Sequence, residues 1–352
     1  MNPNEYRALV VSQRGGGLCN SLFNVINGII KHKDEIILLD EIFTDYSKEN
    51  KCCLSDFLDL DATNKELKVC LIDRYSCKLK VLSAFYGCEN RQIDVTKYFT
   101  DESFVILKSW NLNALFTDPC VGRVKELKIT YSIDGNVFTN TFPERLEEDI
   151  IWNQQIVRND VWKFAKYNFL WYNAYNEESF GKIIPKLRFH KKYNDLCEKI
   201  YENVLKGKEK INVMHLRIED DAIVHWSKQN KLNEKEFEKL LHEKYHSAVY
   251  NNIPKGQSIL ILSYIKNSHP FLDKLRKDFD VILIDKQQYI DTTDREISAL
   301  IDLILSTYCT GIFIGNHNHE LKRGSTFSYF ISCLLPNIPN INIDLDDIRR
   351  NS

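Results

Sequence analysis

Three polar loops of this sequence carry groups that could bind an anion. The first is the glycine-rich segment Arg14-Gly15-Gly16-Gly17, which leads through Asn20 and Ser21 into a helix-compatible stretch. Backbone N–H groups at the start of a helix favour a phosphate or another anion. Asn20 stands where a dinucleotide fingerprint has its last glycine, and Asn20-Ser21 replaces the Lys-Ser or Lys-Thr pair of a phosphate-loop ATPase. The segment is therefore either another kind of anion loop or a turn that only lets strand and helix pack.

The second loop carries an arginine followed by three acids, in the order His215-Leu216-Arg217-Ile218-Glu219-Asp220-Asp221. A guanidinium group can hold a diphosphate through two parallel hydrogen bonds, which a lysine cannot do with the same geometry. The acids could pair with Arg217, orient it, or act as a general base. The alternative is a solvated charged loop with His215 as a satisfied residue at a strand end.

The third loop joins Phe313-Ile314-Gly315-Asn316 to Ser325-Thr326-Phe327-Ser328. Ser and Thr at a helix start can cap the helix and still offer hydroxyl and N–H groups to phosphate. Capping alone would also explain Ser325. His317 and His319 lie between the two halves of the loop, but no cysteine or carboxylate cluster adjoins them, so we expect no metal site.

Short apolar runs and helical patterns surround these loops. Runs at 8–11 and 36–39 flank the helix-compatible stretch 21–31, which predicts a β-α-β unit. In the second half, strands alternate with helices, and such alternation predicts a parallel sheet with ligands at the carboxyl ends of its strands. The predicted strands are 211–217, 259–262, 281–284 and 311–314, and the predicted helices begin at 233, 270, 294 and 325.

These patterns predict an α/β protein with two Rossmann-like domains whose parallel sheets face a central cleft. We expect an N-terminal domain at 1–180 and a C-terminal domain at 181–352. The dipeptide Asp134-Gly135 between alternating residues predicts a hairpin insertion near 125–140 that decorates the first sheet but is not part of it.

Composition argues against a nucleic-acid-binding protein, a membrane-spanning protein and a secreted protein. The 352 residues include 47 Lys and Arg against 49 Asp and Glu, a net charge of −2, which disfavours a nucleic-acid partner. The sequence has no run of about 18 apolar residues, the length needed to span a bilayer, and residues 1–7 lack the pattern of a secretory signal. The even number of cysteines, 10, would permit disulfides, but without a secretory context we expect a cytoplasmic protein with mostly reduced thiols.

Taken together, the three loops resemble the three peptide motifs of the fucosyltransferase superfamily that includes the protein O-fucosyltransferases. The order of the motifs and their places in the two halves of the chain match that family. The resemblance implies that the two domains form a GT-B-like arrangement, with 1–180 on the acceptor side and 181–352 binding the donor. It also implies an inverting and metal-independent glycosyltransferase without a cofactor. Such an enzyme would transfer fucose from GDP-fucose to a hydroxyl of a glycan or protein acceptor and release GDP.

The resemblance also implies roles for individual residues. Arg217 would hold the β-phosphate and stabilise the departing GDP, His215 would support its strand end or touch the nucleotide, and Asp302 would read guanine. The implied donor-binding set is Gly16, Gly17, Asn20, His215, Arg217, Asp302, Ser325, Thr326 and Phe327.

The general base and the donor sugar stay open. Candidate bases are Asp40 and Glu41, at the end of the second predicted strand, and the acids of the second loop, among which we expect Asp221 to pair with Arg217. Another GDP-sugar, such as GDP-rhamnose or GDP-mannose, would use the same contacts. Cys19 and Ser21 stand where the family commonly has Gly and Gln, which keeps open a GT-B protein that binds nucleotide sugars without catalysis.

Overall fold

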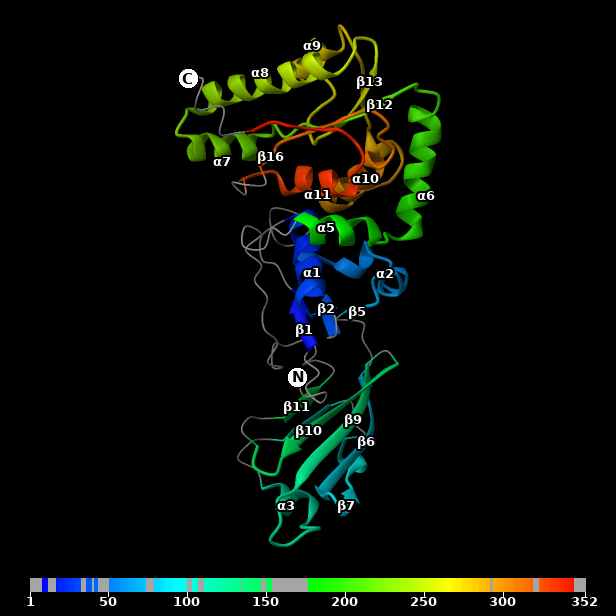
Figure 1. The fold of residues 1–352 in the computed structure, drawn as a ribbon, viewed down its shortest axis with the longest axis vertical. Helices are drawn as coiled ribbons and strands as arrows, with labels where there is room; N and C mark the ends of the chain where they lie inside the picture. Colours follow the sequence, from blue (N-terminus) through cyan, green and yellow to red (C-terminus); the bar gives the residue numbers. More distant parts are fainter. Residues whose placement is uncertain are drawn as a thin grey trace.

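The computed structural model describes residues 8–11, 17–32, 36–39, 41–43, 51–73, 79–99, 103–106, 111–133, 135–146, 150–153, 177–291, 294–318 and 323–344. These residues form an α/β protein with parallel and antiparallel sheets. Figure 1 shows the C-terminal half at one end of the long axis, a small parallel sheet in the middle and an antiparallel sheet at the other end.

The chain opens with the predicted β-α-β unit. A parallel sheet with strand order β1-β2-β5 is flanked by helix α1, whose residues Leu18, Leu22, Val25 and Ile29 are buried at helical spacing. The elements are β1 (Ala8–Val11), α1 (Leu18–His32), β2 (Ile36–Leu39), α2 (Leu60–Leu67) and β5 (Cys70–Asp73), with the small ribbon β3 (Glu41–Phe43) and β4 (Lys51–Cys53) between them.

An antiparallel sheet with strand order β10-β9-β6-β7 follows. Its strands β9 and β10 pair on either side of Gly135, where the sequence predicts a hairpin. The hairpin lies outside the first sheet β1-β2-β5, as the sequence analysis expects. The structure adds that β9 also pairs with β6, so that the four strands make a sheet of their own. The elements are β6 (Leu79–Cys88), β7 (Arg91–Asp94), β8 (Ser103–Ile106), α3 (Leu112–Phe116), β9 (Glu126–Ile133), β10 (Asn136–Pro143) and β11 (Ile150–Asn153), the last paired with β8.

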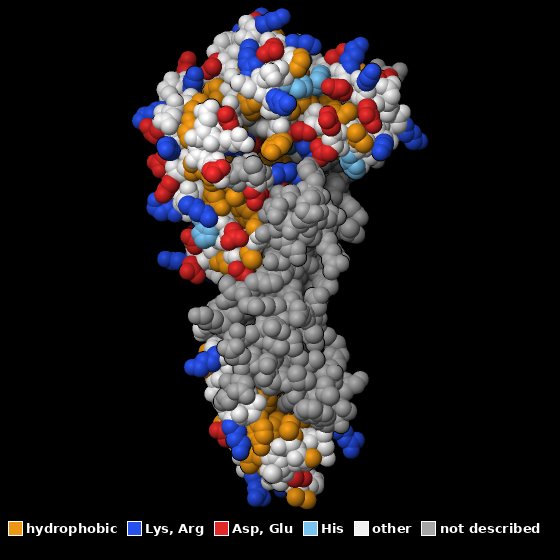
Figure 2. Space-filling view, turned by 180° about the vertical axis from the view of Figure 1, so that it is seen from behind, with side chains coloured by type: hydrophobic (Ala, Val, Ile, Leu, Met, Phe, Trp, Pro, Cys, Tyr) orange, Lys and Arg blue, Asp and Glu red, His pale blue; other side chains and the backbone are white. Residues whose placement is uncertain are grey.

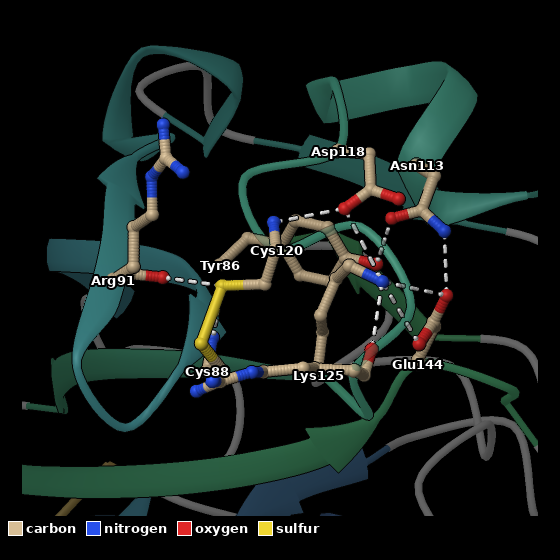
Figure 3. The surroundings of a disulfide bond; sticks show 9 residues. Tyr86, Cys88, Arg91, Asn113, Asp118, Cys120, Lys125 and Glu144 are labelled. Atoms are coloured by element: carbon tan, nitrogen blue, oxygen red, sulfur yellow. Dashed lines mark hydrogen bonds and ion pairs between the residues drawn. A yellow bond between two sulfur atoms is a disulfide. The ribbon is translucent and has the colours of Figure 1, made fainter.

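A buried lysine and a disulfide close the outer end of this sheet (Figure 3). The Cys88–Cys120 disulfide ties the end of β6 to the loop after α3. In that loop, the Lys125 ammonium lies 3.3 Å from an Asp118 oxygen and 3.4 Å from a Glu144 oxygen, with only 3% of its side chain exposed. Two carboxylates therefore compensate the buried charge.

The C-terminal half contains a five-stranded parallel sheet with strand order β14-β13-β12-β15-β18. The predicted alternation of strands and helices is present, and the structure adds α7, where the sequence analysis expects only a polar loop. The elements are α5 (Glu177–Ile183), α6 (Lys191–Ile200), β12 (Ile211–His215), α7 (Asp220–Asn230), α8 (Glu234–Asn252), β13 (Ser258–Leu262), α9 (Pro270–Leu275), β14 (Asp280–Leu283), α10 (Arg295–Ser306), β15 (Phe313–Gly315), β16 (His317–Asn318), β17 (Arg323–Gly324), α11 (Thr326–Leu334) and β18 (Asn340–Asn342).

Helix α1 packs directly against this half. The ring of Phe23 on α1 lies 5.3 Å from that of Phe180 on α5 and 5.4 Å from those of Tyr329 and Phe330 on α11, measured between centroids. All four side chains belong to one apolar core that also contains strands of the C-terminal sheet. The predicted domain boundary between residues 180 and 181 falls within α5, and the division at that point stays a prediction.

The charged surface is mixed. Figure 2 shows Lys and Arg side chains interspersed with Asp and Glu over the C-terminal half on the face it draws. Within the described ranges, no helix combines the length and the apolar character needed to cross a bilayer.

Candidate functional site

A pocket of about 490 Å³ lies where the carboxyl ends of β12 and β13 face the starts of α1 and α11. All three predicted loops contribute to its wall, as expected for loops that follow parallel strands. Of the predicted site residues, those that line the pocket are Gly17, Asn20, His215, Arg217, Glu219, Asp221, Asp302, Ser325, Thr326 and Phe327. Gly16 and Asp40 lie outside the described residues, and Glu41 is described only as backbone of β3.

Arg217 is held by two carboxylates. Its Nη1 lies 2.9 Å from Glu219 Oε2, and its Nη2 lies 2.6 Å from Asp221 Oδ2. The other Glu219 oxygen accepts the Tyr264 N–H at 3.0 Å, so Glu219 is fixed to the loop after β13. The Asp221 side chain is 45% exposed, and the residue lies in the first turn of α7. The predicted pairing of Asp221 with Arg217 is therefore present, and Asp221 is the partner that an incoming anion can replace more easily.

His215 ends β12 with a neutral ring. Its Nδ1 lies 2.6 Å from the hydroxyl oxygen of Ser328, which also accepts the backbone N–H of Asn316 at 3.1 Å. Burial, with further contributions from Arg217 and His317, lowers the pKa of His215 to about 3. His215 thus brings no positive charge to the pocket near neutral pH, and Arg217 supplies the cation beside it.

The third loop places the start of α11 at the pocket. The Ser325 hydroxyl accepts the Ser328 N–H, so Ser325 does cap the helix. Gly324 before it has φ +93°, and a side chain there would collide with the backbone of Asn316. This close approach lets the Ser325 N–H donate to the Asn316 carbonyl at 2.7 Å. Thr326 and Phe327 then line the pocket, with the Phe327 ring 4.8 Å from that of His215.

Asp302 lies on α10 in the pocket wall and has a partner that the sequence analysis does not identify. The Lys286 ammonium, from the segment after β14, lies 2.9 Å from Asp302 Oδ2, and both side chains are about nine-tenths buried. Burial raises the pKa of Asp302, and Lys286 opposes that effect. Lys286 is a single lysine among polar residues, so its sequence context carries no signal of this pairing.

Asn20, on the first turn of α1, leaves one buried acceptor unused. Its Oδ1 has no hydrogen-bond partner among the described residues, and the side chain lines the pocket. Buried polar atoms are nearly always paired in folded proteins, so an unpaired one in a pocket wall indicates a place for a ligand or water.

Glu296 is the second residue that the sequence analysis misses. It lies in the first turn of α10, is 2% exposed, and accepts the Leu18 N–H at the start of α1 through Oε2 at 2.5 Å. A side chain at Gly17 would press on the same carboxylate. A carboxyl group of the protein itself therefore lies at the start of α1, and whether the first loop also binds an external anion stays a prediction. Glu in a first turn is ordinary for any helix, so only the tertiary structure reveals the contact.

Replacing Glu296 tests this contact through the pH dependence of stability. Burial raises the pKa of Glu296 above its unfolded value, so the ionised carboxylate costs stability as the pH rises through the folded pKa. Glu296→Gln keeps an acceptor for Leu18 without the charge. We expect it to gain stability relative to wild type on the order of 1 kcal/mol at pH 8, and less at pH 4.

Urea denaturation at both pH values measures this difference. Glu234→Gln, an exposed change in the first turn of α8, is the control and should not stabilise the protein at pH 8, because it removes a negative charge that favours the helix start. An equal effect of Glu296→Gln at pH 4 and pH 8 would show that its carboxylate is not raised in pKa by the fold.

Comparisons with known proteins give structural matches only. Neither a protein-family model nor a curated protein matches the sequence. The structure matches NodZ alpha-1,6-fucosyltransferase soaked with GDP-fucose at 20% identity, over 46% of this chain and 47% of that chain, with a TM-score of 0.31. It matches POFUT1 in complex with GDP-fucose at 9% identity, over 97% of this chain and 99% of that chain, with a TM-score of 0.49.

POFUT1 in complex with GDP matches at 10% identity over the same shares of both chains, with a TM-score of 0.48. The chain thus spans about half the length of the matched NodZ enzyme and nearly the whole of POFUT1. The matched NodZ protein is an alpha-1,6-fucosyltransferase, and the matched POFUT1 structures contain GDP or GDP-fucose.

Proposed function

We propose that this chain is an inverting GT-B glycosyltransferase that transfers fucose from GDP-fucose to a hydroxyl of a glycan or protein acceptor. The observation that carries the proposal is the position of Arg217, whose guanidinium lies in one pocket with residues of all three loops that resemble the fucosyltransferase motifs. A forked cation at the end of a parallel strand, facing helix starts, suits a diphosphate.

The donor diphosphate would bind Arg217 in place of Asp221. Arg217 then keeps Glu219 on one nitrogen and offers the other to the β-phosphate. As the bond between the sugar and the β-phosphate breaks, negative charge builds on the departing GDP. A fixed guanidinium beside that charge stabilises the transition state without being reorganised. The start of α11 and the unpaired Asn20 oxygen supply further polar contacts to the donor.

Asp302 suits a guanine base. Its carboxylate lines the pocket and can accept from the N1–H and the 2-amino group of guanine, while Lys286 compensates its buried charge. Adenine presents an acceptor at N1, which a carboxylate cannot pair. The GDP part of the donor is therefore better supported than fucose itself, since GDP-mannose and GDP-rhamnose share it.

Transfer also requires a proton acceptor. The acceptor hydroxyl attacks the anomeric carbon, the bond to the β-phosphate breaks, GDP leaves, and the hydroxyl proton passes to a carboxylate or to the departing phosphate. Asp221, released from Arg217 by the donor, is one carboxylate available in the pocket. Roles for Asp40 and Glu41 stay predictions.

A binding protein without turnover is the second candidate, and one observation favours it. The Glu296 carboxylate occupies the start of α1, where a diphosphate would otherwise find free N–H groups. A donor would then be bound mainly by residues of the C-terminal half, which suffices for binding.

A thermal-shift panel with GDP, GDP-fucose, GDP-mannose, UDP, ADP and NAD tests the proposal. A ligand at about 100 times its dissociation constant stabilises the folded protein by about 2.7 kcal/mol. We expect stabilisation by GDP and GDP-fucose, and release of GDP from GDP-fucose over time. Stabilisation without GDP release would favour the binding protein, and a response to UDP or NAD, or to no ligand, would overturn the proposal.

We also propose a cytoplasmic location. Cys19, Cys52, Cys197 and Cys309 are thiols outside any disulfide, which suits a reducing compartment. Cys88 and Cys120 form a disulfide, and whether this bond is present in cells is the observation that bears most directly on this proposal.

A further inference from the structure

The hydroxyl group of Tyr245 joins the two backbone groups on either side of Leu216. It accepts the Arg217 N–H at 3.1 Å and donates to the His215 carbonyl at 3.0 Å. Tyr245 lies on α8, and its side chain is fully buried. It therefore touches the arginine segment from inside the protein and not from the pocket.

These backbone groups lie where the sheet stops supplying partners. The last bond from β12 toward its neighbour is the Leu216 N–H to the Leu262 carbonyl at 3.0 Å, and both strands end there. A buried backbone N–H or carbonyl without a partner costs free energy comparable to a lost hydrogen bond. A phenolic hydroxyl can satisfy one of each because it donates and accepts at once.

Arg217 is thereby held at both of its ends. Glu219 holds the guanidinium, and the Ser263 hydroxyl, which lies 3.1 Å from Glu219, also bonds the Leu216 carbonyl at 2.5 Å. Tyr245 holds the backbone. A guanidinium on a fixed backbone is already oriented when its ligand arrives, and such pre-organisation increases affinity and transition-state stabilisation.

We propose that Tyr245 is a positioning residue for Arg217. The Tyr245 hydroxyl, which lies outside the pocket, increases the affinity for the nucleotide diphosphate by holding the Arg217 backbone in place. The proposal rests on the proposed function, because it takes Arg217 as the diphosphate ligand. Burial raises the pKa of Tyr245, so the hydroxyl keeps its proton for the His215 carbonyl throughout the physiological range.

The test is Tyr245→Phe, with Tyr250→Phe as the matched control. Tyr250 lies on the same helix and donates its hydroxyl to Asp278 at 2.7 Å, outside the described pocket wall. We expect Tyr245→Phe to weaken GDP binding about tenfold in calorimetry, and to lower kcat as well as raise the KM for GDP-fucose. Tyr250→Phe should change neither. A purely structural role would lower the melting temperature and leave the dissociation constant unchanged, which would overturn the proposal.

A double-mutant cycle gives a second readout. In the Arg217→Ala background, Tyr245→Phe should weaken GDP binding no further, since Tyr245 is expected to act on the ligand only through Arg217. An additive loss would overturn the proposal. If Tyr245→Phe does not fold, hydrogen exchange of the wild type decides: the Arg217 amide should be protected like core amides, and rapid exchange there would overturn the proposal.

These results separate the two proposals. If the wild type binds no GDP, the proposed function fails. Suppose instead that the wild type binds GDP, that Arg217→Ala does not bind it, and that Tyr245→Phe binds it as tightly as the wild type. In that case only the positioning role of Tyr245 fails.

Discussion

Arg217→Ala is expected to raise the dissociation constant for GDP at least a hundredfold and to remove the thermal stabilisation that GDP gives. Truncating one member of a close charge pair costs about 2 to 5 kcal/mol. Here the loss also leaves the carboxylates of Glu219 and Asp221 in the pocket without their cation. Their negative charge would then repel the diphosphate. Calorimetric titration with GDP measures the effect.

Two further variants separate the shape of Arg217 from its charge. Arg217→Lys keeps the charge but loses the fork that reaches Glu219 and a phosphate together, so we expect it to recover only part of the affinity. Arg276→Ala removes an arginine that bonds Asn267 and Asp273 on the surface, and it should bind GDP as the wild type does. Undiminished binding by Arg217→Ala would exclude Arg217 as the diphosphate ligand.

The convergence of the three loops could be predicted from the sequence because it depends on local patterns. Buried strands such as Ile259-Leu260-Ile261-Leu262 alternate with amphipathic helices, and the carboxyl ends of parallel strands meet at one edge. The loops that follow those strands must therefore lie together, whatever their exact boundaries. His215, Arg217 and Ser325 come into one pocket for this reason.

The partners of these residues depend on contacts that no local pattern reports. Glu296 meets Leu18 across 278 residues of sequence, and Tyr245 meets Arg217 across 28. Tyr245 has the ordinary appearance of an apolar position on an amphipathic helix, so its hydroxyl gives no hint of a role. Helix α7 could have been predicted, because Ala222, Ile223 and Trp226 are spaced as one apolar face of a helix. The run of acidic residues before them is more typical of a loop, and the sequence analysis therefore expects a loop there.

The antiparallel sheet was hard to predict for a related reason. Its long strand β6 pairs with β9, some 45 residues later, across a segment of short elements. Only the β9–β10 hairpin is local enough to be recognised from its turn. Tyr86 on β6 and Tyr131 on β9 are buried in a core that also contains residues of β5 and α3. Residues far apart in the sequence therefore form this core together.

Removing the Cys88–Cys120 disulfide is expected to destabilise this sheet by about 3 to 4 kcal/mol. The bond closes a chain segment with a sequence separation of 32, and the loss of such a cross-link frees the unfolded chain by about that amount in the loop-entropy account. Cys88→Ser combined with Cys120→Ser should therefore unfold at lower urea concentration. The bond holds the loop that carries Lys125, so its loss also weakens the buried ion pairs with Asp118 and Glu144 (Figure 3).

Reductant provides the control for this prediction. It should lower the stability of the wild type to that of the double variant and leave the double variant unchanged; a wild type indifferent to reductant would contradict the prediction. Thiol titration of the denatured proteins then addresses location. With the bond intact, wild type and double variant expose equal numbers of thiols. If wild type isolated from cytoplasm exposes two more, the bond is open there. Disulfides rarely persist in the cytoplasm. If wild type isolated from its native cells exposes as many thiols as the double variant, the disulfide is intact there, and this would argue for an oxidising compartment.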